Sequence, residues 1–108
     1  MEIFRAFVYY SYKHGVYRAD CGLFDKPSYG RKKREAVYNL TMKIRRKVDE
    51  AIKGGPVIAH FRSNPFCVGM ELVLSGRIEP IREFDFKDSL GRGHRIHVYD
   101  LAERGIEE

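Results

Sequence analysis

Apolar and polar residues alternate along the first part of the chain, which is typical of strands with one buried face. Residues 2–12 (EIFRAFVYYSY) are rich in aromatic and β-branched types, and such residues suit a pleated, half-buried surface. His14-Gly15 then provides a turn before a second apolar run over residues 16–24. The pattern predicts a β-hairpin, followed by turn-forming residues at 25–30.

The two faces of this hairpin differ, because side chains alternate across a strand. One face carries the apolar residues Phe4, Ala6, Val8, Tyr10 and Tyr12 of the first run and Tyr17, Ala19, Cys21 and Leu23 of the second. The other face carries Arg5, Phe7, Tyr9, Ser11, Arg18 and Asp20. A helix packed on the first face leaves Phe7 and Tyr9 on the second, either as core of a two-sided sheet or as an exposed interaction face.

The apolar period changes to that of an α-helix near Arg31. One apolar stripe is formed by Val37, Leu40, Thr41, Ile44, Val48 and Ala51. Gly54-Gly55-Pro56 then ends the pattern, since Gly suits a helix cap and Pro cannot continue the helix. We predict a helix of about 22 residues, over roughly 31–53, whose stripe packs on a sheet.

The following segment has two interpretations. Residues 57–62 (VIAHFR) predict a short buried strand. Asn64-Pro65 is a typical helix start, yet residues 64–76 contain two Val and a Gly, which form helices poorly. Alternation from Met70 onward favours a strand there.

The last third returns to alternation. Residues 77–87 predict a strand with an edge or bulge at Pro80, and residues 94–101 predict a final strand after a turn at 89–93. The element order is β-β-α-β-β-β-β, or β-β-α-β-α-β-β if residues 64–76 are helical. Either order predicts the α+β class, with a mainly antiparallel sheet and one long helix packed on one face.

Length and composition fit this picture. The 108 residues suit a single domain over 1–108, with an acidic tail at about 103–108 that we expect to fray. A hydrophobic content of 44%, with seven Tyr and seven Phe, excludes a disordered chain. Cys21 and Cys67 are too few for a disulfide framework. We find no signal peptide or membrane span and expect a cytoplasmic location and no cofactor.

Charge is concentrated in one segment of the chain. The net charge is +5, and residues 31–47 alone hold eight Lys and Arg against the single acid Glu35. On a helical wheel these cations flank both sides of the apolar stripe, and such a surface releases counterions when it binds phosphates. The predicted phosphate-binding residues are Lys32, Lys33, Arg34, Lys43, Arg45, Arg46 and Lys47. The alternatives are a solvated helix face and docking on an acidic protein surface.

The aromatic hairpin offers a second candidate surface. Unpaired bases stack on exposed rings beside cations, so Tyr9 with Arg5 and Arg18 could extend a nucleic-acid site. Alternatively Phe7 and Tyr9 are core residues, anchors for a protein partner, or a homodimer interface.

Signals for catalysis are weaker. His60 and Arg62 share a strand face and could act in phosphodiester cleavage, with His60 as acid or base and Arg62 on the phosphate. His94 and His97 fall on opposite faces of a strand, so they cannot bind one metal together. A metal-dependent nuclease needs converging carboxylates; Asp20, Glu71 and Asp85 could meet across the sheet, but balanced surface charge explains them better. We predict no metal site.

The sequence thus favours a small non-enzymatic domain that binds nucleic acid through a basic helix, RNA and DNA being equally possible. The first alternative is a protein-binding module, an inhibitor or adaptor that docks its basic helix and aromatic hairpin on a partner. The second is a phosphodiesterase or nuclease that uses His60 and Arg62.

Overall fold

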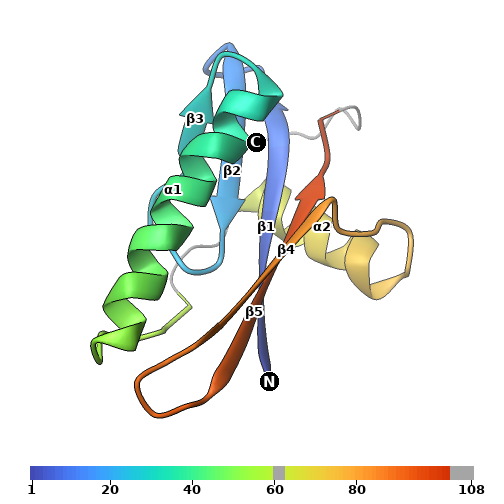
Figure 1. Cartoon of the computed structure of the whole chain (residues 1–108). Helices are drawn as coiled ribbons and strands as arrows, with labels where there is room; N and C mark the ends of the chain where they lie inside the picture. The colour runs from blue at the N-terminus through green and yellow to red at the C-terminus, as the bar shows by residue number, and fades with distance from the viewer. Residues whose placement is uncertain (60–62, 103–108) are drawn as a thin grey trace.

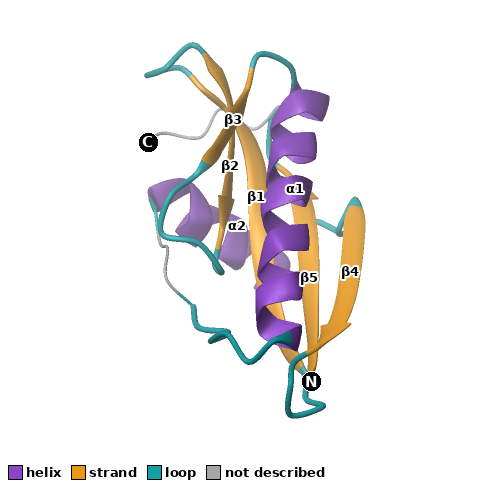
Figure 2. Cartoon of the chain, turned by 60° about the vertical axis from the view of Figure 1, so that its left-hand side comes forward, coloured by secondary structure: helices purple, strands orange, loops and turns teal. Residues whose placement is uncertain are grey.

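The fold is a five-stranded sheet with one helix on each face (Figure 1, Figure 2). The computed structural model describes residues 1–59 and 63–102. It confirms the α+β class and contains, besides the predicted long helix, the second helix that the alternative order places at residues 64–76. The elements are β1 (Glu2–Ser11), β2 (Val16–Cys21), β3 (Ser28–Gly30), α1 (Lys33–Ile52), α2 (Asn64–Leu74), β4 (Arg82–Lys87) and β5 (Gly93–Asp100).

The sheet is mixed rather than simply antiparallel. Its strand order is β3-β2-β1-β5-β4, and β1 lies at the centre. Val8 of β1 pairs with Ala19 of antiparallel β2 on one side and with Asp100 of parallel β5 on the other. Three of the four strand pairings are antiparallel, as predicted, and the pairing of β1 with β5 is parallel. Because β2 already occupies one edge of β1, the late β4–β5 hairpin pairs with the free edge.

The predicted long helix is confirmed as α1. Its stripe residues Leu40 and Ile44 are buried against the predicted apolar face of β1 and β2. Gly30 of β3 allows a close approach, since a Cβ there would lie 2.3 Å from the backbone nitrogen of Ala36. The first turn of α1 therefore lies directly over β3.

Residues 64–74 form a helix, and the predicted strand from Met70 is wrong. Ser63 caps α2, because its Oγ accepts a hydrogen bond from the backbone nitrogen of Phe66 at 3.1 Å. Pro65 lies in the first turn, where its missing N–H costs nothing. The start signals noted in the sequence thus outweigh the low helix propensity of the segment.

The second helix covers the face of the sheet opposite α1 (Figure 2). Beneath it lies a second core, made of Phe7, Tyr9, Phe66, Tyr99 and Leu101. Phe7 and Tyr9 are therefore core residues of a two-sided sheet. Their rings are not exposed as base platforms, protein anchors or a dimer interface.

Several predicted boundaries also change. Residues 57–59 form no strand, and residues 60–62 of the same predicted strand lie outside the described residues. Residues 28–30 pair with β2 as a strand instead of forming only a turn, and the strand predicted at 77–87 begins at Arg82. The predicted acidic tail, 103–108, also lies outside the described residues. Within residues 1–59 and 63–102, neither helix is long and apolar enough to cross a membrane.

Candidate functional site

A groove of about 610 Å³ lies between α1 and the start of β4. Arg34, Tyr38 and Arg45 of α1 line it at intervals of one and about two helical turns, so they follow one another along the same side of the helix. Arg34 and Arg45 are separated by about three turns, or roughly 16 Å. We call this feature the α1 groove; its lining is Lys33, Arg34, Val37, Tyr38, Thr41, Met42, Arg45, Ile81, Arg82 and Asp100.

The α1 groove is strongly basic. Four cationic side chains line it against one carboxylate, Asp100. The charge of that carboxylate is neutralised by an ion pair, because Nζ of Lys33 lies 2.8 Å from its Oδ2. Arg82 lies over the ring of Phe84 at 5.2 Å, whereas Arg34 and Arg45 are exposed and make no ion pair within residues 1–59 and 63–102. Three guanidinium groups thus carry charge that the groove itself does not neutralise.

The remaining predicted basic residues of the helix do not line this groove. Lys43 lies on the other side of the apolar stripe, where its Nζ donates to the carbonyl oxygen of Lys26 at 2.9 Å and lies 4.7 Å from the ring of Phe24. Partial burial lowers the pKa of Lys43. Lys32 and Arg46 are exposed outside the groove, and Lys47 is half-buried. The predicted set is thus divided between two sides of α1.

Arg5, Tyr9 and Arg18 lie on the opposite face of the sheet from α1. Tyr9 is 1% exposed, and its hydroxyl donates to Oδ2 of the buried Asp20 at 2.9 Å. Nε of Arg18 donates to Oδ1 of Asp20 at 2.8 Å. Burial acts to lower the pKa of Arg18, but the hydrogen bond and charge of Asp20 outweigh it and raise that pKa. These groups hold the second core together, and the stacking role predicted for Tyr9 lacks an exposed ring.

Three other tyrosines gather at the α1 face of the sheet: Tyr10 and Tyr17 are half-buried, and Tyr12, in the turn after β1, is exposed. The ring of Tyr10 meets that of Tyr12 at 4.9 Å and that of Tyr17 at 5.2 Å, both edge to face. Tyr12 is 75% exposed. We call Tyr10, Tyr12 and Tyr17 the tyrosine cluster. The alternation in the sequence places these rings on the apolar face, and the structure shows that Tyr17 packs against the core under α1 while Tyr12 is exposed.

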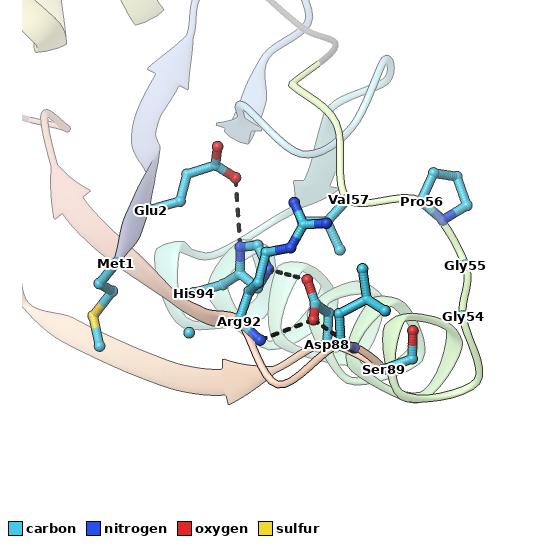
Figure 3. Close-up of a pocket in the computed structure, with 12 residues that line it drawn as sticks. Met1, Glu2, Gly54, Gly55, Pro56, Val57, Asp88, Ser89, Arg92 and His94 are labelled. Carbon is cyan, nitrogen blue, oxygen red and sulfur yellow. Dashed lines mark hydrogen bonds and ion pairs between the residues drawn. The ribbon is translucent and has the colours of Figure 1, made fainter.

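A second hollow, of about 590 Å³, is lined by His94 and by residues near the starts of β1 and β5, including Glu2 and Asp88 (Figure 3). The His94 side chain is 6% exposed, and its Nε2 lies 3.0 Å from Oδ2 of Asp88. Its Nδ1 lies 3.4 Å from a carboxylate oxygen of Glu2, at ion-pair distance but without a hydrogen bond. The hydrogen bond with His94 holds the pKa of Asp88 below its usual range. This arrangement joins the start of β1 to the β4–β5 turn.

Among the described residues we find no other cluster of side chains suited to catalysis or metal binding. His94 and His97 do lie on opposite faces of β5, as predicted: His94 packs on Phe86, and His97 contacts Tyr99. No cluster of three metal-ligating side chains occurs within residues 1–59 and 63–102. The catalytic candidates His60 and Arg62 lie outside the described residues.

The three carboxylates considered for a metal site do not converge in the sheet. Asp20 belongs to β2, and Asp85 belongs to β4, where Arg95 donates to it at 2.6 Å. Two strands, β1 and β5, separate β2 from β4. Glu71 is an exposed residue of α2.

Comparison of this chain with protein-family models, with curated proteins and with solved structures found no match.

Proposed function

We propose that this protein binds nucleic acid electrostatically through the α1 groove. The observation that carries the proposal is the pair Arg34 and Arg45, two exposed guanidinium groups on one side of α1 without ion-pair partners in the described parts of the chain. A guanidinium group presents a planar set of donors that matches phosphate geometry. Arg82 adds a third guanidinium group from the β4 wall of the groove, while Lys33 pairs with Asp100.

The exposed ring of Tyr38 favours nucleic acid over an acidic protein surface. Tyr38 lies between Arg34 and Arg45 in the groove and is 63% exposed. Surfaces that bind single-stranded nucleic acid combine aromatic rings, on which bases stack, with cations that contact the phosphates. The alternative, docking on an acidic protein, has less support, because its predicted apolar anchors Phe7 and Tyr9 are buried beneath α2 and cannot contact a partner.

Salt dependence of binding tests the proposal. Fluorescently labelled 15-nucleotide single strands and 15-base-pair duplexes are titrated at 50 and 200 mM salt. Contact with three or four phosphates predicts a loss of affinity between these concentrations of roughly 40- to 150-fold for the duplex and roughly 20- to 50-fold for the single strand. If neither oligonucleotide binds at 50 mM salt, the proposal is wrong, and the next experiment is a search for a protein partner.

The chain offers a closely matched pair of variants. Arg45 and Arg46 are adjacent and both exposed, but only Arg45 lines the groove. Arg45→Gln should weaken binding to all sequences and lower the salt slope by about 0.9 for the duplex and about 0.7 for the single strand. Arg46→Gln carries the same change of net charge and should leave the slope unchanged. Equal slopes for the two variants mean that the groove is not the binding site.

A further inference from the structure

The tyrosine cluster adjoins one end of the α1 groove. Val8 pairs with Asp100, which lines the groove and holds Lys33. Tyr10 lies two residues beyond Val8 on the same face of β1, about 7 Å further along the strand. The rings of the cluster therefore continue the line of the groove beyond Asp100.

Exposed rings and cations thus succeed one another along this face. From the far end of the groove, the order is Arg45, Tyr38, Arg34, and then the tyrosine cluster. Tyr38 and Tyr12 are 63% and 75% exposed. Tyr10 contacts both other rings of the cluster edge to face, which restricts their motion before any ligand binds.

We infer that the nucleic acid bound here is single-stranded, with unpaired bases stacked on Tyr38 and Tyr12 and its phosphates on the neighbouring arginines. The inference rests on the proposed function, because it assumes that the groove binds nucleic acid. A duplex keeps its base faces inside its own stack and offers this surface only phosphates and base edges. A single strand offers both phosphates and free base faces, so it satisfies the cations and the rings together.

An internal control for the tyrosines lies on the opposite face. Tyr29 is exposed, and its ring lies 5.9 Å from the guanidinium carbon of Arg18 and 5.7 Å from the ring of His14. It pairs in register with Arg18, whose side chain points away from α1. Tyr29 is thus an exposed ring beside a cation that does not belong to the inferred path.

The test measures affinity for a 15-nucleotide oligothymidylate and a 15-base-pair duplex with Tyr38→Leu, Tyr12→Leu, Tyr38→Phe and Tyr29→Leu. Each leucine variant on the path should weaken binding of the single strand about tenfold while duplex affinity changes less than about twofold. Tyr38→Phe keeps the ring and should keep the affinity. Tyr29→Leu should bind like the original chain, and unchanged thermal unfolding shows that each variant folds.

Tyrosine emission gives an independent readout, because the chain contains no Trp. Stacked bases should quench this emission when the oligothymidylate is added, and less so in Tyr38→Leu. Equal losses for single strand and duplex, or a Tyr38→Phe variant as weak as Tyr38→Leu, overturn the single-strand inference. The proposed function still stands in that case if Arg45→Gln lowers the salt slope, and it fails with the inference if neither oligonucleotide binds.

Discussion

Gly69 of α2 lies directly against the ring of Phe7 in β1. A Cβ atom at Gly69 would lie 2.4 Å from Cδ1 of Phe7, closer than real Cβ contacts come. The ring has little room to move, because Phe66 meets it edge to face at 5.2 Å and Tyr99 stacks on it at 5.3 Å. The absence of a side chain at position 69 therefore sets how closely α2 packs on the sheet.

Gly69→Ala should destabilise the protein despite improving helix propensity. Overpacking costs about 1–3 kcal/mol, and the gain from replacing a helical Gly is about 1 kcal/mol, so we expect a net loss of up to roughly 2 kcal/mol. Urea unfolding measures it. The matched control is Gly22→Ala, whose Cβ would meet Phe66 at an ordinary 3.6 Å. Equal stabilities of the two variants would contradict the tight packing of α2.

The same glycine explains why the strand predicted from Met70 is wrong. The low helix propensity of Gly and Val argues against a helix in this segment. In the fold, Gly69 is the residue that lets the helix approach Phe7, and Ser63 caps its start. Tertiary packing thus overrode local propensity, which no single-sequence pattern displays.

Long-range pairing accounts for the other differences in the fold. The period of α1 is local, so its stripe and its end at Gly54 were predictable. The parallel pairing of Val8 with Asp100 joins residues far apart in the chain. No turn signal connects them, and the sequence patterns therefore predict a mainly antiparallel sheet.

The sequence predicts which types of residue the candidate site contains, but not which of them are exposed on the same surface. The helical wheel predicts cations on both sides of the apolar stripe, and the structure places Arg34 and Arg45 on one side and Lys43 on the other. Strand alternation likewise separated Tyr9 from Tyr10, but it does not tell which face of the sheet a second helix covers. The sequence therefore predicts a stacking role for Tyr9, which is buried, whereas Tyr12 is exposed and Tyr10 and Tyr17 are half-buried.

The bond from Tyr9 to Asp20 provides a second stability test. Asp20 is fully buried and accepts hydrogen bonds from the Tyr9 hydroxyl, from Ser63 Oγ at 2.6 Å and from Arg18 Nε. Tyr9→Phe should cost about 1.5–3 kcal/mol, the range for a hydrogen bond to a charged group. Tyr10→Phe removes a hydroxyl from the next residue, on the opposite face, and should cost less than about 0.5 kcal/mol. Unfolding curves of both variants make the comparison, and equal costs would mean that Asp20 does not need Tyr9.

The depressed pKa of Asp88 predicts a pH-dependent contribution to stability. Its hydrogen bond with His94, followed by bonds from the backbone nitrogens of Arg92 and Leu90, favours the carboxylate in the folded state. A carboxyl with a lowered folded pKa stabilises the protein above the unfolded value, 3.8, and loses that contribution as pH falls through the folded pKa. Asp88→Asn should therefore lower the urea midpoint at pH 7 and approach the original chain below about pH 4. A difference between the two proteins that stays constant with pH would contradict this account.

The two cysteines should differ sharply in reactivity. Cys21 is buried in the core beneath α1, and burial raises its pKa to about 12, so at pH 8 only about one molecule in ten thousand carries the reactive thiolate. Cys67 lies exposed on α2. A maleimide should therefore modify one thiol of the native protein rapidly and the second only after unfolding in urea. In Cys67→Ser the native protein should resist modification, and the rate at Cys21 then reports how often the sheet opens beneath α1. Rapid modification of native Cys67→Ser would show that β2 is accessible and that this core is not closed.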